Sequence, residues 1–312
     1  MKVLLIQADG KWPNLALMKL STYHKILGDR VYLNSCVEPD LVYISCIFSW
    51  SRRQALGLAK FYPEAEIKIG GSGFNLKDEL TPEAEHVTPD YDLYGMEHSM
   101  GFTSRGCIRN CPWCIVPKKE GMIREHSPLS EIIDPRHDKL LLLDNSFLAS
   151  PRATEKLQEL IERKIKVSFN QGNDIRLIND ENAALLAKTE YRDSDFNERR
   201  LYFSFDLPSI ESQVIEGIKT LGSAGILLGH LMFYMLCGFN TTHEEDYHRF
   251  EVLNGLGVDP FVMKYNNRRD DVWLAHFARW VNKRYYKVCT LDEYLKKKGY
   301  NNKIHRNEGK EE

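Results

Sequence analysis

The chain has 312 residues, of which 43% are hydrophobic and 28% charged, so its composition predicts a folded protein with a sizeable core. The 42 Lys and Arg against 44 Asp and Glu give a net charge of −2, which argues against a strongly basic nucleic-acid binder, although a local basic face stays possible. No apolar run approaches the roughly 20 residues that a membrane span needs, and Gln7, Asp9 and Lys11 interrupt the N-terminal run before it reaches signal-peptide length. We therefore expect a soluble, cytoplasmic protein with no membrane partner.

Strand and helix patterns alternate over the first ninety residues. The apolar run Lys2–Gln7 predicts a buried parallel strand, and Pro13 predicts the start of a helix that ends near Gly28. Two more strands are expected at Leu41–Cys46 and Glu66–Ile69, with a helix at Arg52–Phe61 between them. This spacing is typical of a small Rossmann-like sheet, to which we assign residues 1–95.

Six further strands are expected in residues 96–266, about thirty residues apart. They are Met100–Ser104, Leu140–Leu143, Lys166–Asn170, Leu201–Asp206, Leu231–Leu236 and Pro260–Lys264. Helical patterns lie between most of them. Six units are too few for a full eight-fold barrel, so we predict an α/β fold in which a partial (β/α)6 TIM-like barrel follows the Rossmann-like domain. Residues 267–312 are helical and aromatic in pattern, and we expect a helical C-terminal cap there.

Three of the seven cysteines lie close together, since Cys107, Cys111 and Cys114 have the spacing C-x3-C-x2-C. An odd number of cysteines argues against a disulfide framework. A structural zinc site normally needs four ligands in pairs, and His126 is a lone candidate for the fourth. Three thiolates on one loop suit an iron–sulfur cluster in which one iron stays open to a ligand. We therefore predict a cluster rather than zinc or unligated thiols.

The cysteine motif resembles that of the radical S-adenosylmethionine (SAM) superfamily. The three cysteines follow the first expected barrel strand, Trp113 directly precedes the third, and the likeness covers about residues 98–265. Residues 101–121 (GFTSRGCIRNCPWCIVPKKEG) are most similar to the branch with a cobalamin-binding-type Rossmann domain before the barrel, here shortened. They also resemble the methylthiotransferases, in which Pro and basic residues follow the third cysteine.

The resemblance implies that Cys107, Cys111 and Cys114 ligate a [4Fe-4S] cluster whose open iron binds the amine and carboxylate of SAM. One electron, from a donor such as flavodoxin or ferredoxin, would break the C5′–S bond, and the resulting 5′-deoxyadenosyl radical would abstract hydrogen from a substrate. The cofactor supplies this chemistry, while the protein tunes the cluster and excludes water. A nucleic acid, a peptide and a small metabolite all stay open as the substrate.

Polar residues follow the second and third expected barrel strands, where such barrels place ligand contacts. The resemblance implies that Asp144 and Asn145 receive the ammonium group of SAM, although the more usual Gly-Gly-Glu is absent and an Asx turn is the alternative. Gln171 and Arg176 follow the third strand in a polar segment that would be costly to bury unpaired, so we expect them to line a cavity. Arg176 could pair with a carboxylate or a phosphate; a solvated loop is the alternative.

The ends of the fourth and fifth expected strands carry the remaining candidate residues. Alternation places Ser204 and Asp206 on one face, where the resemblance implies contacts with ribose hydroxyls. Gly238 resembles the segment that cradles adenine, because a residue without a side chain lets the backbone approach a base. Cys237 beside it could donate a hydrogen atom to a substrate radical, or could pack as a small apolar side chain.

Cobalamin is not expected as a cofactor. The D-x-H-x-x-G motif is missing, because Thr22 stands in place of the Asp before His24, and Gly28 lies one position too far. Cys36 and Cys46 are too few for the second cluster of a methylthiotransferase. A cobalamin methylase and a complete methylthiotransferase are therefore poor matches.

Two other classes of function compete with a radical SAM enzyme. They are a non-catalytic iron–sulfur sensor or binding module and a zinc-stabilised nucleic-acid-binding protein. The basic and aromatic stretch with Arg268, Arg269, Arg284, Trp280 and Tyr286 would suit phosphate contact and base stacking, but a solvated helix that packs its aromatic residues on the barrel explains it too. Polar groups after several strands favour the enzyme, because a sensor needs no SAM pocket.

Overall fold

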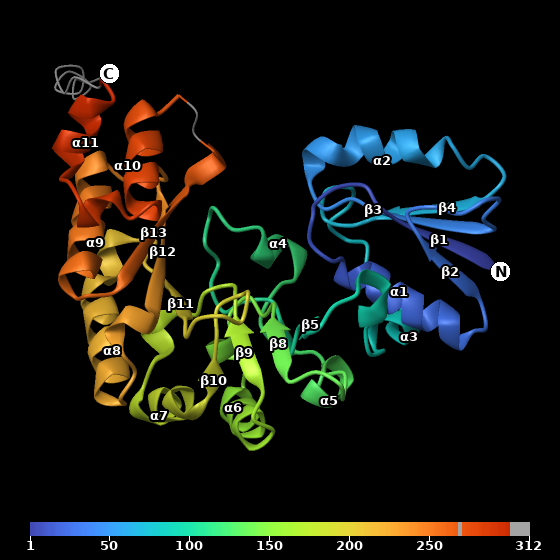
Figure 1. The fold of residues 1–312 in the computed structure, drawn as a ribbon, viewed down its shortest axis with the longest axis horizontal. Helices are drawn as coiled ribbons and strands as arrows, with labels where there is room; N and C mark the ends of the chain where they lie inside the picture. The colour runs from blue at the N-terminus through green and yellow to red at the C-terminus, as the bar shows by residue number, and fades with distance from the viewer. Residues whose placement is uncertain (268–269, 300–312) are drawn as a thin grey trace. The chain divides into compact units, whose positions relative to one another are not determined.

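In the computed structural model, the first four strands form one parallel sheet in the order β2-β1-β3-β4 (Figure 1). Their bounds are Lys2–Gln7 (β1), Arg30–Leu33 (β2), Leu41–Ser45 (β3) and Glu66–Gly70 (β4). The strands β1, β3 and β4 agree with the expected ones. The sequence pattern does not predict β2, an edge strand, because its four partly exposed residues give too short an alternation to recognise.

Helices cover both faces of this sheet. Val3 of β1 lies in one core with α1 (Leu15–Ile26), whereas Leu4 lies in another with α2 (Arg52–Ala59). Figure 1 shows these two helices on opposite sides of the sheet. The side chain of Asn14 caps the start of α1. Burial on both faces is why β1 is a continuous apolar run rather than an alternating one.

The six strands expected in residues 96–266 are all present and all parallel to their neighbours. They are β5 (Ser99–Gly101), β8 (Lys139–Leu142), β9 (Lys166–Phe169), β11 (Leu201–Ser204), β12 (Leu231–Cys237) and β13 (Asp259–Lys264). Five of them match the expected bounds closely. The expected strand Met100–Ser104 is instead divided, because Ser104–Arg105 (β6) pairs antiparallel with Arg124–Glu125 (β7). The α/β class with parallel sheets is therefore confirmed.

These strands form two hydrogen-bonded sheets rather than one. The orders are β10-β9-β8-β5 and β11-β12-β13, because a short β10 (Glu190–Tyr191) takes the position beside β9. The chain correspondingly divides into two compact units. The first unit comprises residues 1–171 and 188–199, and the second comprises residues 172–187 and 200–312. The division runs through residues 96–266, which we expected to form one domain.

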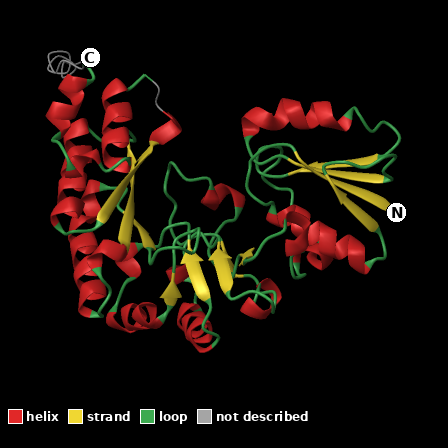
Figure 2. Cartoon of the chain, viewed as in Figure 1, coloured by secondary structure: helices red, strands yellow, loops and turns green. Residues whose placement is uncertain are grey.

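Helices follow most of these strands (Figure 2). They are α6 (Ala153–Glu162), α7 (Asp180–Lys188), α8 (Glu211–Ser223), α9 (His243–Gly255), α10 (Val272–Asn282) and α11 (Leu291–Lys297). The structure describes residues 1–267 and 270–299, so Arg268, Arg269 and residues 300–312 of the expected cap lie outside the described residues. Among the helices of the described ranges, none has both the length and the apolarity to cross a membrane.

A charged cluster joins three segments of the first unit. Glu85, at the end of α3 (Pro82–Glu85), accepts hydrogen bonds from Lys19 of α1 at 2.8 Å and contacts His126 Nε2 at 2.9 Å. Burial raises the pKa of Glu85, but the hydrogen bond with His126 and the charge and hydrogen bond of Lys19 outweigh it and lower the pKa to about 2. The carboxylate therefore stabilises the fold in its charged form.

We expect this cluster to make the fold sensitive to acid. Because the pKa of Glu85 lies below its value of 4.5 in the unfolded chain, its contribution is complete above pH 4.5 and is lost as the pH falls toward 2. In Glu85→Gln, the free energy of unfolding should fall less steeply over this range, as urea titrations at several pH values would measure. Glu83→Gln, at an exposed position of the same helix, is the control. If the free energy of unfolding fell equally with pH in the parent protein and in Glu85→Gln, the stabilising role of the Glu85 carboxylate would be contradicted.

Candidate functional site

The three clustered cysteines lie on a hairpin that follows β5. We call residues 104–125 the cysteine hairpin; β6 and β7 form its base, and the short helix α4 (Val116–Lys119) lies after the third cysteine (Figure 1). Gly106 has φ +82°, and a Cβ there would lie 2.3 Å from the carbonyl oxygen of Met122. The backbone N–H of Cys107 donates to Gly121 O at 3.2 Å. The two arms thus meet so closely that only glycine fits at position 106.

The sulfur atoms accept hydrogen bonds from the backbone of the hairpin. Arg109 N–H donates to Cys107 Sγ at 3.4 Å, and Val116 N–H donates to Cys114 Sγ at 3.5 Å. All seven cysteines, which lie within the described residues, are outside disulfides, and the three of the motif are half-buried. Such N–H groups stabilise negative charge on sulfur, as thiolate ligation of iron requires.

The charge of the hairpin also suits thiolates. Residues 105–124 carry five basic residues and one acid. Among the described residues, no group of three or more His, Cys, Asp or Glu side chains could hold a metal ion. By residue type, three thiols on one loop are a donor set that suits an iron–sulfur cluster. Trp113 is half-buried between the second and third cysteines.

His126 does not join the cysteines as a zinc ligand. Its Nε2 contacts Glu85, and its backbone N–H donates to Thr103 O at 3.0 Å. This ring is engaged in the charged cluster with Lys19 and Glu85.

Asp144 does not present its carboxylate to a ligand. The side chain is 5% exposed, and it accepts four hydrogen bonds, from the backbone N–H and the hydroxyl of both Thr103 and Ser104, at 2.5–2.8 Å. These partners saturate it, so the expected contact with the ammonium group of SAM does not agree with this geometry. The Asx turn is also wrong, because the bonds reach residues about forty positions earlier. Burial raises the pKa of Asp144, and the bonds from Thr103 and Ser104 oppose that shift.

Asn145 contacts a residue that sequence reasoning missed. Its Nδ2 donates to Glu120 Oε2 at 2.7 Å, and the same oxygen accepts from Gly106 N–H at 3.0 Å. Arg105 lies 3.4 Å from the other oxygen, and the Glu120 side chain is only 7% exposed. The sequence did carry a signal, since Glu120 is the one acidic residue in the stretch 105–124, which also holds five basic residues.

In the second unit, Asp206 and Arg176 each have a partner within the chain, and the two partners differ. Asp206 Oδ1 accepts from Leu236 N–H at 2.9 Å, which joins the ends of β11 and β12. Burial raises the pKa of Asp206, while the Leu236 hydrogen bond and Arg249 lower it. Arg176 donates to both oxygens of Asp174, at 2.6 and 2.9 Å, whereas the expected pairing with a carboxylate or phosphate of a ligand stays a prediction. Ser204 is half-buried in the second unit, and Gln171 is exposed in the first.

Gly238 lies against the protein itself. It has φ +82°, and a Cβ there would come within 2.8 Å of Leu274 Cδ2 on α10. Its N–H faces Asp246 Oδ2 at 3.2 Å. Close approach at Gly238 is thus made by α10, whereas contact with an adenine stays a prediction. Cys237 is fully buried and burial raises the pKa of its thiol, as expected if it packs as an apolar side chain.

A buried ion pair that the sequence did not reveal supports these strand ends. Arg249 and Asp246 of α9 have no exposed surface, and their side chains are 2.5 Å apart. The Arg249 guanidinium also donates to Phe205 O at 2.5 Å and to Leu236 O at 2.8 Å. One arginine therefore ties the ends of β11 and β12 to the helix behind them.

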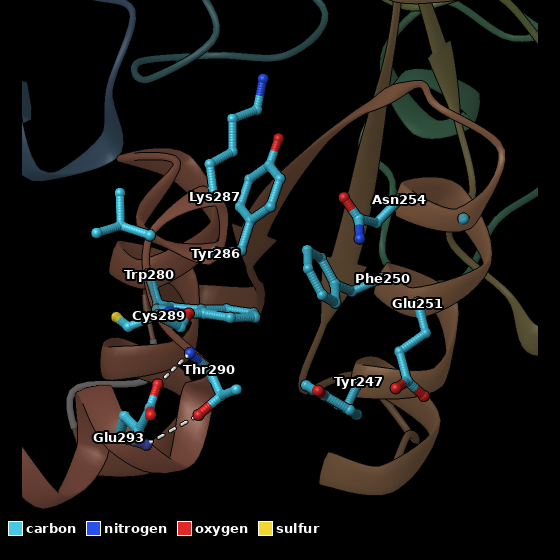
Figure 3. Close-up of a pocket in the computed structure, with 12 residues that line it drawn as sticks. Tyr247, Phe250, Glu251, Asn254, Trp280, Tyr286, Lys287, Cys289, Thr290 and Glu293 are labelled. Atoms are coloured by element: carbon cyan, nitrogen blue, oxygen red, sulfur yellow. Dashed lines mark hydrogen bonds between the residues drawn. The ribbon is translucent and has the colours of Figure 1, made fainter.

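The aromatic C-terminal stretch packs mainly within the second unit. A cavity of about 550 Å³ lies between α9 and the segment that leads into α11; in Figure 3, Phe250 stands on one side, with Trp280 and Tyr286 on the other. Trp280 is 2% exposed and its Nε1 donates to Cys289 O at 3.1 Å. Arg284 pairs with Asp259 at 2.7 Å. Trp280 thus follows the packing interpretation rather than base stacking.

In comparisons with known proteins, no family model matches the chain and no curated protein matches it. The resemblance to radical SAM enzymes therefore depends on the cysteine motif and the strand pattern.

We expect Asp144→Ala to destabilise the fold rather than to weaken a ligand site specifically. It leaves several buried donors unpaired, so the free energy of unfolding should fall by about 2–4 kcal/mol in urea titrations. Asp138→Ala removes an exposed ion pair with Lys166 near the start of the same strand and should cost less than about 1 kcal/mol. Equal losses in the two variants would contradict the anchoring role of Asp144.

We also expect Asp246→Ala to leave the buried guanidinium of Arg249 without its counter-charge. The loss should be about 3–5 kcal/mol in the free energy of unfolding. Glu251→Ala, at an exposed position of the same helix, should change it by less than about 0.5 kcal/mol. A loss near 1 kcal/mol in Asp246→Ala would show that the ion pair is not the main connection between these strand ends.

Proposed function

We propose that the protein is a radical SAM enzyme. The observation that carries the proposal is the cysteine hairpin, in which three half-buried thiols follow the first barrel-type strand and two of the sulfurs accept backbone N–H groups. The parallel order of β5, β8 and β9 and of β11, β12 and β13 supports the finer proposal that the two sheets are parts of a partial barrel. The sheet of residues 1–95 is proposed as the shortened Rossmann-like domain.

The residues of the hairpin would have separate tasks. Cys107, Cys111 and Cys114 would hold a [4Fe-4S] cluster as thiolates, and the surrounding basic residues would offset their charge. When bound, the cluster and SAM supply reductive cleavage of the C5′–S bond and so a 5′-deoxyadenosyl radical. The protein would exclude water around these groups, and an external donor of the flavodoxin or ferredoxin type would supply the electron.

Contacts with SAM are proposed, as the resemblance implies, for six residues: Trp113, Asn145, Gln171, Ser204, Asp206 and Gly238. Arg176 is proposed to act through the carboxylate of Asp174, which it already holds. Asp144 is removed from this set, because four internal donors occupy it. We propose a cytoplasmic enzyme that does not use cobalamin, and we assign no substrate.

The test is anaerobic reconstitution with iron and sulfide, followed by an assay for 5′-deoxyadenosine. The parent protein should show a [4Fe-4S] signal that changes when SAM is added, because the open iron gains ligands. Cys111→Ala should abolish the cluster and SAM cleavage, whereas the control Cys36→Ala, at a half-buried position in the loop between β2 and β3, should retain both.

Three other outcomes have distinct meanings. Stoichiometric zinc with no uptake of iron would refute the cluster. A stable cluster whose spectrum ignores SAM would instead indicate a sensor or binding module. Equal loss of iron in Cys36→Ala and Cys111→Ala would refute the assignment of the ligands.

A further inference from the structure

We propose that Glu120 is a positioning residue that keeps the cysteine hairpin closed and fixes it to the end of β8. Its role in closing the hairpin stands on the contacts of the chain itself. Its role in placing the ligands of a cluster deepens the proposed function and rests on it.

Glu120 connects three segments, two of them through its carboxylate. Through Oε2 it accepts from Gly106 N–H in the first arm of the hairpin and from Asn145 Nδ2 beyond β8. Its own backbone oxygen accepts from Arg124 in the second arm at 2.5 Å. Glu120 thus connects both arms of the hairpin and links them to the neighbouring strand.

Burial makes these contacts selective for the closed hairpin. The Glu120 side chain is 7% exposed, so opening the hairpin would leave a buried carboxylate without its donors or transfer it to water. Arg105 lies 3.4 Å from Oε1, and hydrogen bonds to a charged acceptor are stronger than those between neutral groups. The negative charge of Glu120 therefore strengthens the closure.

The adjacent residues Asp144 and Asn145 hold opposite sides of the hairpin. Asp144 binds Thr103 and Ser104, where the first arm begins. Asn145 binds Glu120, which lies just before the second arm. The pair after β8 therefore acts as a support for the cysteine hairpin, with Glu120 as its far contact.

Closure at Glu120 acts directly beside the first cysteine. Gly106, whose N–H donates to Glu120, precedes Cys107, and the N–H of Cys107 donates to Gly121 next to Glu120. Loss of the carboxylate would release the backbone on both sides of this contact. The position of Cys107 relative to the other two thiols would then no longer be fixed.

The first test uses the metal-free, full-length protein and limited trypsin digestion, with cleavage after Lys118 and Lys119 followed by mass spectrometry. Glu120→Ala should be cleaved there about tenfold faster, because the open form becomes more populated. Glu120→Gln should be cleaved more slowly than Glu120→Ala, since its amide oxygen can still accept from Gly106 N–H and Asn145, but faster than the parent, because the charge that strengthens the closure is lost. Glu97→Ala, at an exposed position of the first unit, is the matched control.

These digestions decide the role in closure without iron. Cleavage of Glu120→Ala at the parental rate would overturn the proposal. So would equal acceleration at cleavage sites throughout the chain, because that would show a global loss of stability. If Glu120→Ala does not fold, Asn145→Ala replaces it, and unchanged cleavage of that variant would overturn the link to β8.

The second test addresses the cluster. In reconstituted protein, Glu120→Ala should lose iron to a chelator faster than the parent, because the open hairpin no longer fixes Cys107 relative to the other thiols, whereas Glu120→Gln should stay closer to the parent. Equal iron loss in the parent and Glu120→Ala would overturn the role toward the cluster and leave closure supported by the digestions. If the parent protein takes up no iron, the proposed function fails, and the trypsin result still decides the role of Glu120.

Discussion

The carboxylate of Asp144 is the constraint on which the candidate site depends. It is almost completely buried and gathers four hydrogen bonds from Thr103 and Ser104. Because two of these donors are backbone N–H groups, the chain leaves the β5 ladder at this point and turns into the cysteine hairpin. A buried charge without such partners would cost several kcal/mol, so the position of the hairpin and the burial of Asp144 require each other.

The second unit solves a similar problem with a buried cation. Arg249 has no exposed surface, and its guanidinium donates to the carbonyl oxygens of Phe205 and Leu236 and pairs with Asp246. Carbonyl groups at the ends of parallel strands otherwise lack ladder partners, and a planar group with five donors can satisfy several at once. Both units thus use one buried charged side chain to order the strand ends where a barrel-type enzyme places its ligands.

Three of the polar residues that follow the strands also hold the chain together. Asp144, Asp206 and Arg176 were expected at a ligand site, and each has a partner within the chain. Position at a strand end is a local property, but the partners of Asp144 and Asp206 lie 41 and 30 residues away in the sequence. The cysteines differ, since three thiols in so short a loop lie near one another along the chain itself.

The sequence by itself determined the parallel α/β strands and the local grouping of the three thiols, because apolar runs and short spacings express local backbone geometry. It missed β2 and β10, whose few residues lie at sheet edges. Only the tertiary structure decided the roles of Asp144, Glu120 and Arg249. Their partners lie up to 44 residues away in the sequence, and buried charges take whichever donors the packing of strands brings within reach.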